Sequence, residues 1–203
     1  MAYCLDFQNH WANTPDALDL ARHFVAQAIE KSPNDPYAHY VAAVISIWKR
    51  DLEGAKAEAE KALTLNSNYA LAYGTRGLIE VYLGHPLAAI PDLERAMRLD
   101  PAFTQQYMHF LGSAYLVAGQ YEAAATAFRE RIRLVPKTDL SRALLACALG
   151  HLGESAEARR AWDELRNTNS KYSFEEHLAR LPFKNQADAE SIRDGLARAG
   201  LPE

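Results

Sequence analysis

Side chains that could carry out chemistry are few and scattered in this sequence. Cys147 and His151 stand one helical turn apart, and His109 precedes them in the chain. Thiolate and imidazole are ligands that Zn²⁺ prefers, but a tetrahedral site needs a fourth ligand, and the spacing supplies none. No serine or cysteine stands in a nucleophile turn, and no glycine-rich phosphate loop is present. We therefore expect no catalytic residue, no metal and no cofactor.

Aromatic and aliphatic side chains offer a different chemistry, which is the binding of apolar groups. They recur at helical spacing in several successive segments, so each segment would present them on one face. The residues predicted to line a partner-binding groove are Tyr37, Tyr40, Val44, Ile47, Trp48, Leu71, Leu78, Val81, Tyr82, His109, Leu116 and Val117.

A regular repeat determines how these residues are positioned. Residues that close a loop recur at intervals of 34 or 35, namely Pro33, Ser67, Pro101, Pro136 and Ser170. The clearest unit runs from Met108 to Pro136, where Gly112 allows two antiparallel helices to approach closely. Tyr115, Ala124 and Phe128 would fill the space between these helices. Such a hairpin buries only part of its apolar surface alone, and it therefore needs copies of itself on both sides.

These offsets resemble those of the tetratricopeptide repeat (TPR) over about Ala2 to Ser170. The resemblance implies an all-α fold, a TPR-type α-solenoid in which antiparallel helix pairs form a right-handed superhelix. We expect residues 1–172 to form about five pairs, the first of them degenerate, and residues 173–203 to form C-terminal capping helices. The first helix of each pair would line the concave surface.

Several local features of this array are also predicted. The degenerate pair would consist of a helix over about Ala2 to Ala12 and a second helix ending near Lys31, with Ala28 facing inward. Pro91 lies inside a predicted helix, where it removes one backbone hydrogen bond and should kink the helix. Arg76 and Glu80 stand one turn apart, so we expect a local ion pair. Ser173 and Asn185 should cap the two C-terminal helices.

The lining of the predicted groove carries almost no fixed charge. TPR domains that hold acidic tails use lysines and asparagines on these faces, whereas Tyr40, Val44 and Leu78 stand here. We therefore predict a non-catalytic interaction module that binds an unidentified peptide or partner helix. In the alternatives, neighbouring repeats bury the aromatic residues, a homodimer covers the groove as a structural oligomerisation element, or the region around Pro182 and Phe183 folds back into it.

Three segments carry a narrower resemblance: RLDPAF, QYMHFLGSAYLVAGQYEAAATAFRERIRLVPKTDLSRALLACALGHLG and YSFEEHLARLPFKNQADAESIRDGLARAGLPE. They are similar to the C-terminal TPR regions of bacterial class III adenylate/guanylate cyclases. In that family the TPR region follows the cyclase domain as a regulatory arm. No aspartate pair in a βαβ context is present in this sequence, so the resemblance does not extend to cyclase activity.

Composition sets the remaining limits. The 203 residues carry a net charge of −4 and are 49% hydrophobic, which is typical of a packed protein and gives no reason to bind nucleic acid or a membrane surface. No apolar run reaches the ~20 residues of a membrane-spanning helix. The first residues have no basic segment followed by an apolar one, so they do not form a secretory signal. Cys4 and Cys147 are expected to be free thiols, which favours the cytoplasm.

Overall fold

The computed structural model describes residue 1 and residues 16–202. Residues 16–202 form eleven α-helices and one short 3-10 turn, with no β-strand in this range. The helices are α2 (Ala17–Lys31), α3 (Pro36–Trp48), α4 (Leu52–Leu65), α5 (Ala70–Tyr82), α6 (Pro86–Leu99), α7 (Thr104–Val117), α8 (Tyr121–Leu134), α9 (Leu140–His151), α10 (Ser155–Thr168), α11 (Phe174–Arg180) and α12 (Gln186–Arg198). The 3-10 turn, Pro101–Phe103, precedes α7.

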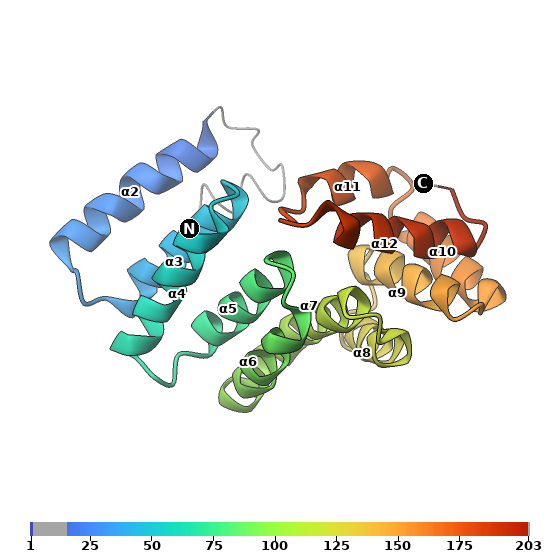
Figure 1. Ribbon diagram of the computed structural model, residues 1–203, viewed down its shortest axis with the longest axis horizontal. Helices are drawn as coiled ribbons and strands as arrows, with labels where there is room; N and C mark the ends of the chain where they lie inside the picture. Colours follow the sequence, from blue (N-terminus) through green and yellow to red (C-terminus); the bar gives the residue numbers. More distant parts are fainter. Residues whose placement is uncertain (2–15, 203) are drawn as a thin grey trace.

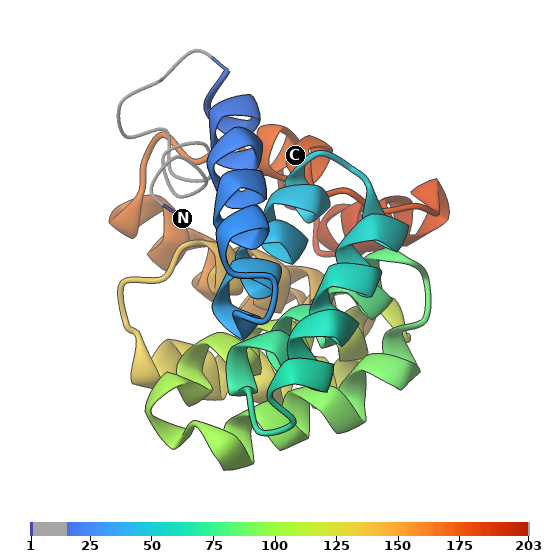
Figure 2. The same ribbon diagram turned by 90° about the vertical axis from the view of Figure 1, so that its left-hand side faces the viewer.

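Four helical hairpins, α3–α4, α5–α6, α7–α8 and α9–α10, form a continuous arc (Figure 1). The first helices of successive hairpins contact one another, and α2 packs on α3 at one end of the array (Figure 2). This arrangement is the predicted solenoid, and the helix pairs fall where the repeat places them. The predicted helix over residues 2–12 lies outside the described residues.

The turns inside the hairpins share one backbone conformation. Gly84, Gly119 and Gly153 have φ values of 87°, 73° and 76°, in the left-handed region that glycine enters without steric cost. Arg50 occupies the same place in the α3–α4 turn, with φ of 61°. An arginine there carries a conformational cost that the other three hairpins avoid.

Small residues allow the paired helices to pack closely. Ala55, Ala59 and Ala62 are fully buried on α4, as predicted. A Cβ atom on Gly112 would lie 2.6 Å from the ring of Phe128, so the missing side chain makes room for that ring. Because each hairpin is incomplete alone, its apolar surface joins that of its neighbours in a series of connected core clusters.

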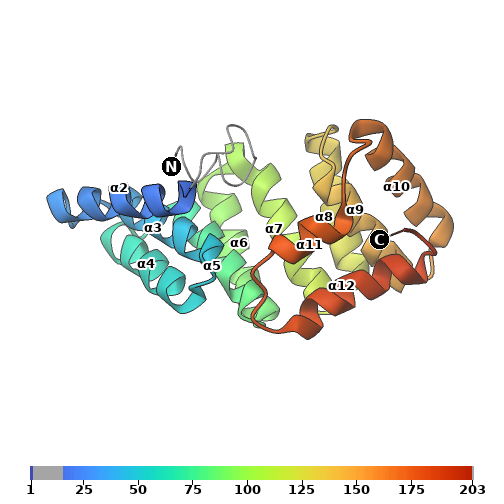
Figure 3. The same cartoon turned by 90° about the horizontal axis from the view of Figure 1, so that it is seen from above.

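The last two helices pack against the end of the array. The hydroxyl of Ser173 accepts a hydrogen bond from the amide of Glu176, and the Asn185 side chain accepts one from Ala187. α12 crosses α9 where Gly150 and Gly195 face each other, with backbone in direct contact. Figures 1 and 3 both show the turn between α11 and α12 reaching back towards the end of α5.

Two local predictions are wrong. Ala28 is exposed, because α2 packs on α3 through Ala21 and Val25 instead. Arg76 and Glu80 do not pair with each other, since better acceptors and donors lie on neighbouring helices. The Arg76 guanidinium donates two hydrogen bonds to Asp92, at 2.6 and 2.7 Å.

The Glu80 carboxylate instead contacts Lys56 at 2.7 Å and His85 at 3.1 Å. The interhelical ion pairs therefore join α5 to both of its neighbours, α4 and α6. Helix α6 continues through Pro91.

Candidate partner-binding surface

Four of the twelve predicted groove residues belong to the core. Ile47, Val81, Tyr82 and Leu116 are all buried, because the first helices of adjacent hairpins pack against one another through these side chains. They are not accessible to a partner in this structure. The prediction of an open lining is wrong for these four residues.

The other eight predicted residues remain partly or largely accessible. The side chain of Tyr37 is 48% exposed, and the remaining seven are half-buried: Tyr40, Val44, Trp48, Leu71, Leu78, His109 and Val117. Tyr40, Val44 and Trp48 pack on the cluster that contains Val41 and Ile45, at the N-terminal end of the array. Leu78 and Val117 lie nearer its middle.

Tyrosines from three successive hairpins converge near the starts of α3, α5 and α7. We call Tyr37, Tyr40, Tyr69 and Tyr107 the tyrosine cluster. The rings of Tyr37 and Tyr40 lie 6.0 Å apart, and those of Tyr40 and Tyr69 lie 5.7 Å apart in an edge-to-face arrangement. A Cβ atom on Gly74 would collide with the ring of Tyr107, so this glycine provides the space for that ring.

The hydroxyls of Tyr69 and Tyr107 stay protonated at neutral pH. Burial, together with Tyr40 and Tyr37, raises the pKa of Tyr69. Burial raises the pKa of Tyr107 as well, with Asp100 and Tyr40 adding to the shift. The hydroxyl of Tyr107 is buried and has no hydrogen-bond partner within the described part of the chain. The cluster therefore combines apolar ring surface with hydrogen-bonding hydroxyls.

Sequence reasoning missed Tyr69 and Tyr107. Both stand close to helix starts, outside the inward-facing positions from which the groove was predicted. The signal that could have found them is the recurrence of aromatic residues at these starts, because Tyr69 and Phe103 are separated by one repeat length.

The chain itself occupies the opposite end of the concave face. Residues Leu181–Lys184, which we call the strap, connect α11 to α12. The ring of Phe183 stands edge-to-face on Tyr82 with centroids 5.1 Å apart, and the amide of Lys184 donates a hydrogen bond to the Tyr82 carbonyl at 2.8 Å. The predicted fold-back of Pro182 and Phe183 thus describes this contact.

Residues with catalytic potential have structural partners. His109 Nδ1 and Ser141 Oγ lie 3.0 Å apart and join α7 to α9, but Ser141 is only 1% exposed and no substrate could reach it. Burial, aided by Arg131 and His177, lowers the pKa of His109 to about 3, so the ring is neutral at pH 7.

The two predicted metal-ligand candidates also contact other parts of the chain. Cys147 is a free, buried thiol whose pKa is raised by burial. His151 Nε2 hydrogen-bonds the Ser191 carbonyl at 2.8 Å, and its ring stacks on Tyr121. Among the described residues, no three His, Cys, Asp or Glu side chains are grouped as metal ligands would be.

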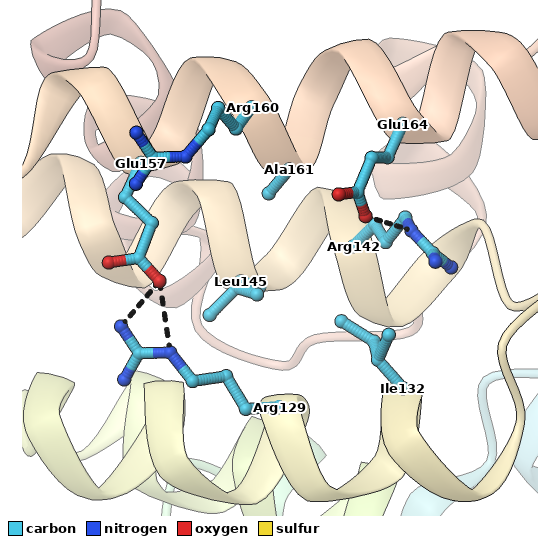
Figure 4. Close-up of a pocket in the computed structure, with 8 residues that line it drawn as sticks. All are labelled: Arg129, Ile132, Arg142, Leu145, Glu157, Arg160, Ala161 and Glu164. Atoms are coloured by element: carbon cyan, nitrogen blue, oxygen red, sulfur yellow. Dashed lines mark hydrogen bonds and ion pairs between the residues drawn. The ribbon is translucent and has the colours of Figure 1, made fainter.

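A small cavity of about 210 Å³ lies between α8, α9 and α10 (Figure 4). Its charged walls are paired with each other: Arg129 hydrogen-bonds Glu157, and Arg142 hydrogen-bonds Glu164. These pairs satisfy most of the polar groups that could hold a small ligand. Over residues 16–202, moreover, no helix combines the length and apolarity required to cross a bilayer.

Comparison with known proteins agrees with this architecture. Residues 70–103, which contain α5 and α6, match the tetratricopeptide repeat. PilW, described as a widely conserved type IV pilus biogenesis factor, is 14% identical with a TM-score of 0.75, over 97% of this chain and 86% of PilW.

Two further structures share the fold. PilF of Pseudomonas aeruginosa is 20% identical with a TM-score of 0.69, over 98% of this chain and 87% of PilF. YrrB, described as a TPR protein with an unusual peptide-binding site, is 20% identical with a TM-score of 0.59, over 86% of this chain and 90% of YrrB. Residues 70–103 thus match a tetratricopeptide repeat, and the described chain has the fold of a TPR-type α-solenoid.

Proposed function

We propose that the protein is a non-catalytic interaction module that binds a peptide segment of a partner on its concave face. The tyrosine cluster carries this proposal, because Tyr37, Tyr40 and Tyr69 present ring surface from two neighbouring hairpins, with the buried Tyr107 packed behind them. Tyrosine is enriched among the residues that dominate protein interfaces, since it offers a large apolar surface at a small cost in side-chain entropy.

The expected ligand is a segment with apolar side chains and free backbone acceptors. Its apolar groups would pack on Tyr37 and on the half-buried Val44, while its carbonyls would accept hydrogen bonds from the tyrosine hydroxyls. The peptide-binding site described for YrrB, which has the same fold, supports a peptide as the ligand class. The free thiol of Cys147 is consistent with a reducing compartment, and we propose the cytoplasm.

The cyclase-like segments lead to a narrower proposal. If the repeats act as the regulatory arm that this resemblance implies, partner binding on the concave face would be transmitted to a nucleotide-cyclising domain. The three segments quoted above are its support.

Peptide display against the intact chain tests the proposed function. We expect a random library to yield peptides whose affinity falls at least about tenfold for Tyr37→Glu, because a charge at the centre of an apolar contact is desolvated without a partner. Leu87→Glu is the matched control, since Leu87 is 57% exposed on α6, away from the cluster.

Equal binding to both variants would reject the tyrosine cluster as the site. Light scattering of the unliganded chain across a dilution series distinguishes the alternative. A tight dimer that Tyr37→Glu dissociates would indicate homo-oligomerisation through this surface instead of a separate partner.

A further inference from the structure

The strap makes contacts that a solenoid does not require. In a repeat array each unit contacts its neighbours only, so residues far apart in sequence stay apart in space. Here the Lys184 ammonium lies 2.9 Å from the Glu53 carboxylate, 131 residues away. Arg50 donates a hydrogen bond to the carbonyl of Ala179, 129 residues away, at 2.9 Å. Together with the contacts to Tyr82, these bonds tie the end of the chain to the α3–α4 and α5–α6 hairpins.

Phe183 is the central apolar contact of the strap. Its ring packs on three core clusters, those containing Tyr82, Leu93 and Leu116, and it lies against predicted groove residues. The Tyr82 carbonyl that accepts the Lys184 amide lies in the last turn of α5, where a helix leaves carbonyls without internal partners. The Phe183 ring thus covers apolar surface of the array, and the Lys184 amide pairs with a carbonyl that α5 leaves without an internal partner.

Arg50 provides a second, independent observation. It adopts the left-handed conformation in a turn where the three equivalent hairpins have glycine. Strain of this kind persists where a side chain has a separate role, and here the guanidinium holds Ala179 at the base of the strap. Arg50, Glu53 and Phe183 also border a cavity of about 280 Å³ beside the strap, so the surface is larger than the strap covers.

We infer that the strap is an internal ligand of the concave face, and that this end of the face recognises an extended partner segment with the same chemistry, an aromatic side chain followed by a basic one. The inference extends the proposed function to a second region of the same face. The aromatic ring would stand on Tyr82, and the cation would pair with Glu53. A partner gains access when the strap separates from the α5–α6 hairpin.

Apart from the Phe183 ring and the Lys184 amide, the contacts of the strap are weak. Its ion pair is exposed, with side chains 59% and 70% accessible, and pairs of this kind contribute little. α11 and α12 are held separately, by Phe174 and Leu178 in the core and by the Gly150–Gly195 crossing. The strap can therefore leave its site while both helices stay docked.

Competition by the strap predicts a measurable effect. A tethered ligand acts at an effective concentration on the order of 1 mM, so a segment with an intrinsic Kd of about 0.1 mM lowers the apparent affinity of a free competitor about tenfold. Releasing the strap should therefore raise the apparent affinity of the free competitor about tenfold.

The test uses a labelled synthetic peptide of residues 177–187 and measures its binding to the intact chain by fluorescence anisotropy. We expect Phe183→Ala to bind the peptide at least about tenfold more tightly than the wild type, and Lys184→Ala to bind it at least about twofold more tightly. Lys184→Ala removes an exposed ion pair from the strap but leaves Glu53 to receive the lysine of the peptide, so the variant should fold with its site intact. Lys137→Gly, which removes an exposed cation in another loop, should bind as the wild type does.

A second peptide, in which alanine replaces the residue equivalent to Phe183, should bind none of the variants tightly. The inference is overturned if Phe183→Ala and Lys184→Ala, shown by thermal melting to be folded, bind the peptide no more tightly than the wild type. It is also overturned if both peptides bind equally. Neither result affects the proposed function, which depends on Tyr37 at the other end of the concave face.

Discussion

At the scale of single residues, two arginines show how differently the same side chain can be used. Arg76 donates two hydrogen bonds to Asp92, whose side chain is only 15% exposed. Arg131, in the last turn of α8, has a buried Nε that finds no acceptor among the described residues, and burial lowers its pKa. The first guanidinium joins two helices, whereas the second carries a buried donor without a hydrogen bond.

This contrast predicts opposite effects of the same substitution. Arg76→Met should lower the free energy of unfolding by about 1–3 kcal/mol, because it leaves the Asp92 carboxylate partly buried without its partner. Arg131→Met should leave stability unchanged or raise it by up to about 1 kcal/mol, because an apolar side chain of similar length removes an unsatisfied donor. Urea denaturation of both variants measures this, and a loss of more than about 1 kcal/mol for Arg131→Met would contradict the account.

Residue-level predictions from sequence succeeded where the cause was local. The packing of Gly112, Ala124 and Phe128 follows from offsets within one repeat, and the structure confirms that all three are buried. The Arg76 partner was missed because Asp92 stands 16 residues away on the next helix, and helical spacing reports only neighbours within one turn. The tyrosine cluster was missed for a similar reason, since it depends on contacts between hairpins.

At the scale of elements, the crossing of α9 and α12 anchors the C-terminal end of the chain. Gly150 and Gly195 bring the two backbones into contact, and α12 is thereby fixed against the fifth repeat. The sequence predicted both helices and their caps because each carries its own start signal. It did not predict which helix α12 would contact, since nothing in the spacing of glycines identifies the partner of a close approach.

Gly150→Ala tests this crossing. Alanine normally favours a helix over glycine by about 1 kcal/mol, but here the added Cβ would collide with the backbone carbonyl of Gly195, which has no alternative position. We expect a net loss of about 1–3 kcal/mol by urea denaturation.

Gly153→Asn serves as the control, because a Cβ atom at Gly153 would meet nothing within 4 Å and asparagine tolerates the left-handed conformation. It should cost less than about 1 kcal/mol. A stabilised Gly150→Ala variant would show that the two helices are not in close contact.

At the scale of the whole molecule, the repeat period determined the solenoid but not the state of its concave face. The period places hairpins side by side, and this architecture follows from contacts between neighbours. The occupancy of the face depends instead on contacts between residues more than 100 positions apart in sequence, which join the segment around the strap to the α3–α4 and α5–α6 hairpins. The sequence predicted one open groove of twelve residues. The structure instead has the tyrosine cluster at one end of the concave face and the strap covering the other end.

The most direct test of this account is amide hydrogen exchange at Lys184, followed by NMR on the intact chain. The Lys184 amide lies in a loop, so its protection depends on the hydrogen bond to the Tyr82 carbonyl across the concave face. We predict exchange at least about tenfold slower than in a free peptide, and loss of this protection in Phe183→Ala while amides in α12 stay protected. Exchange of the wild-type Lys184 amide at the free-peptide rate would contradict the account.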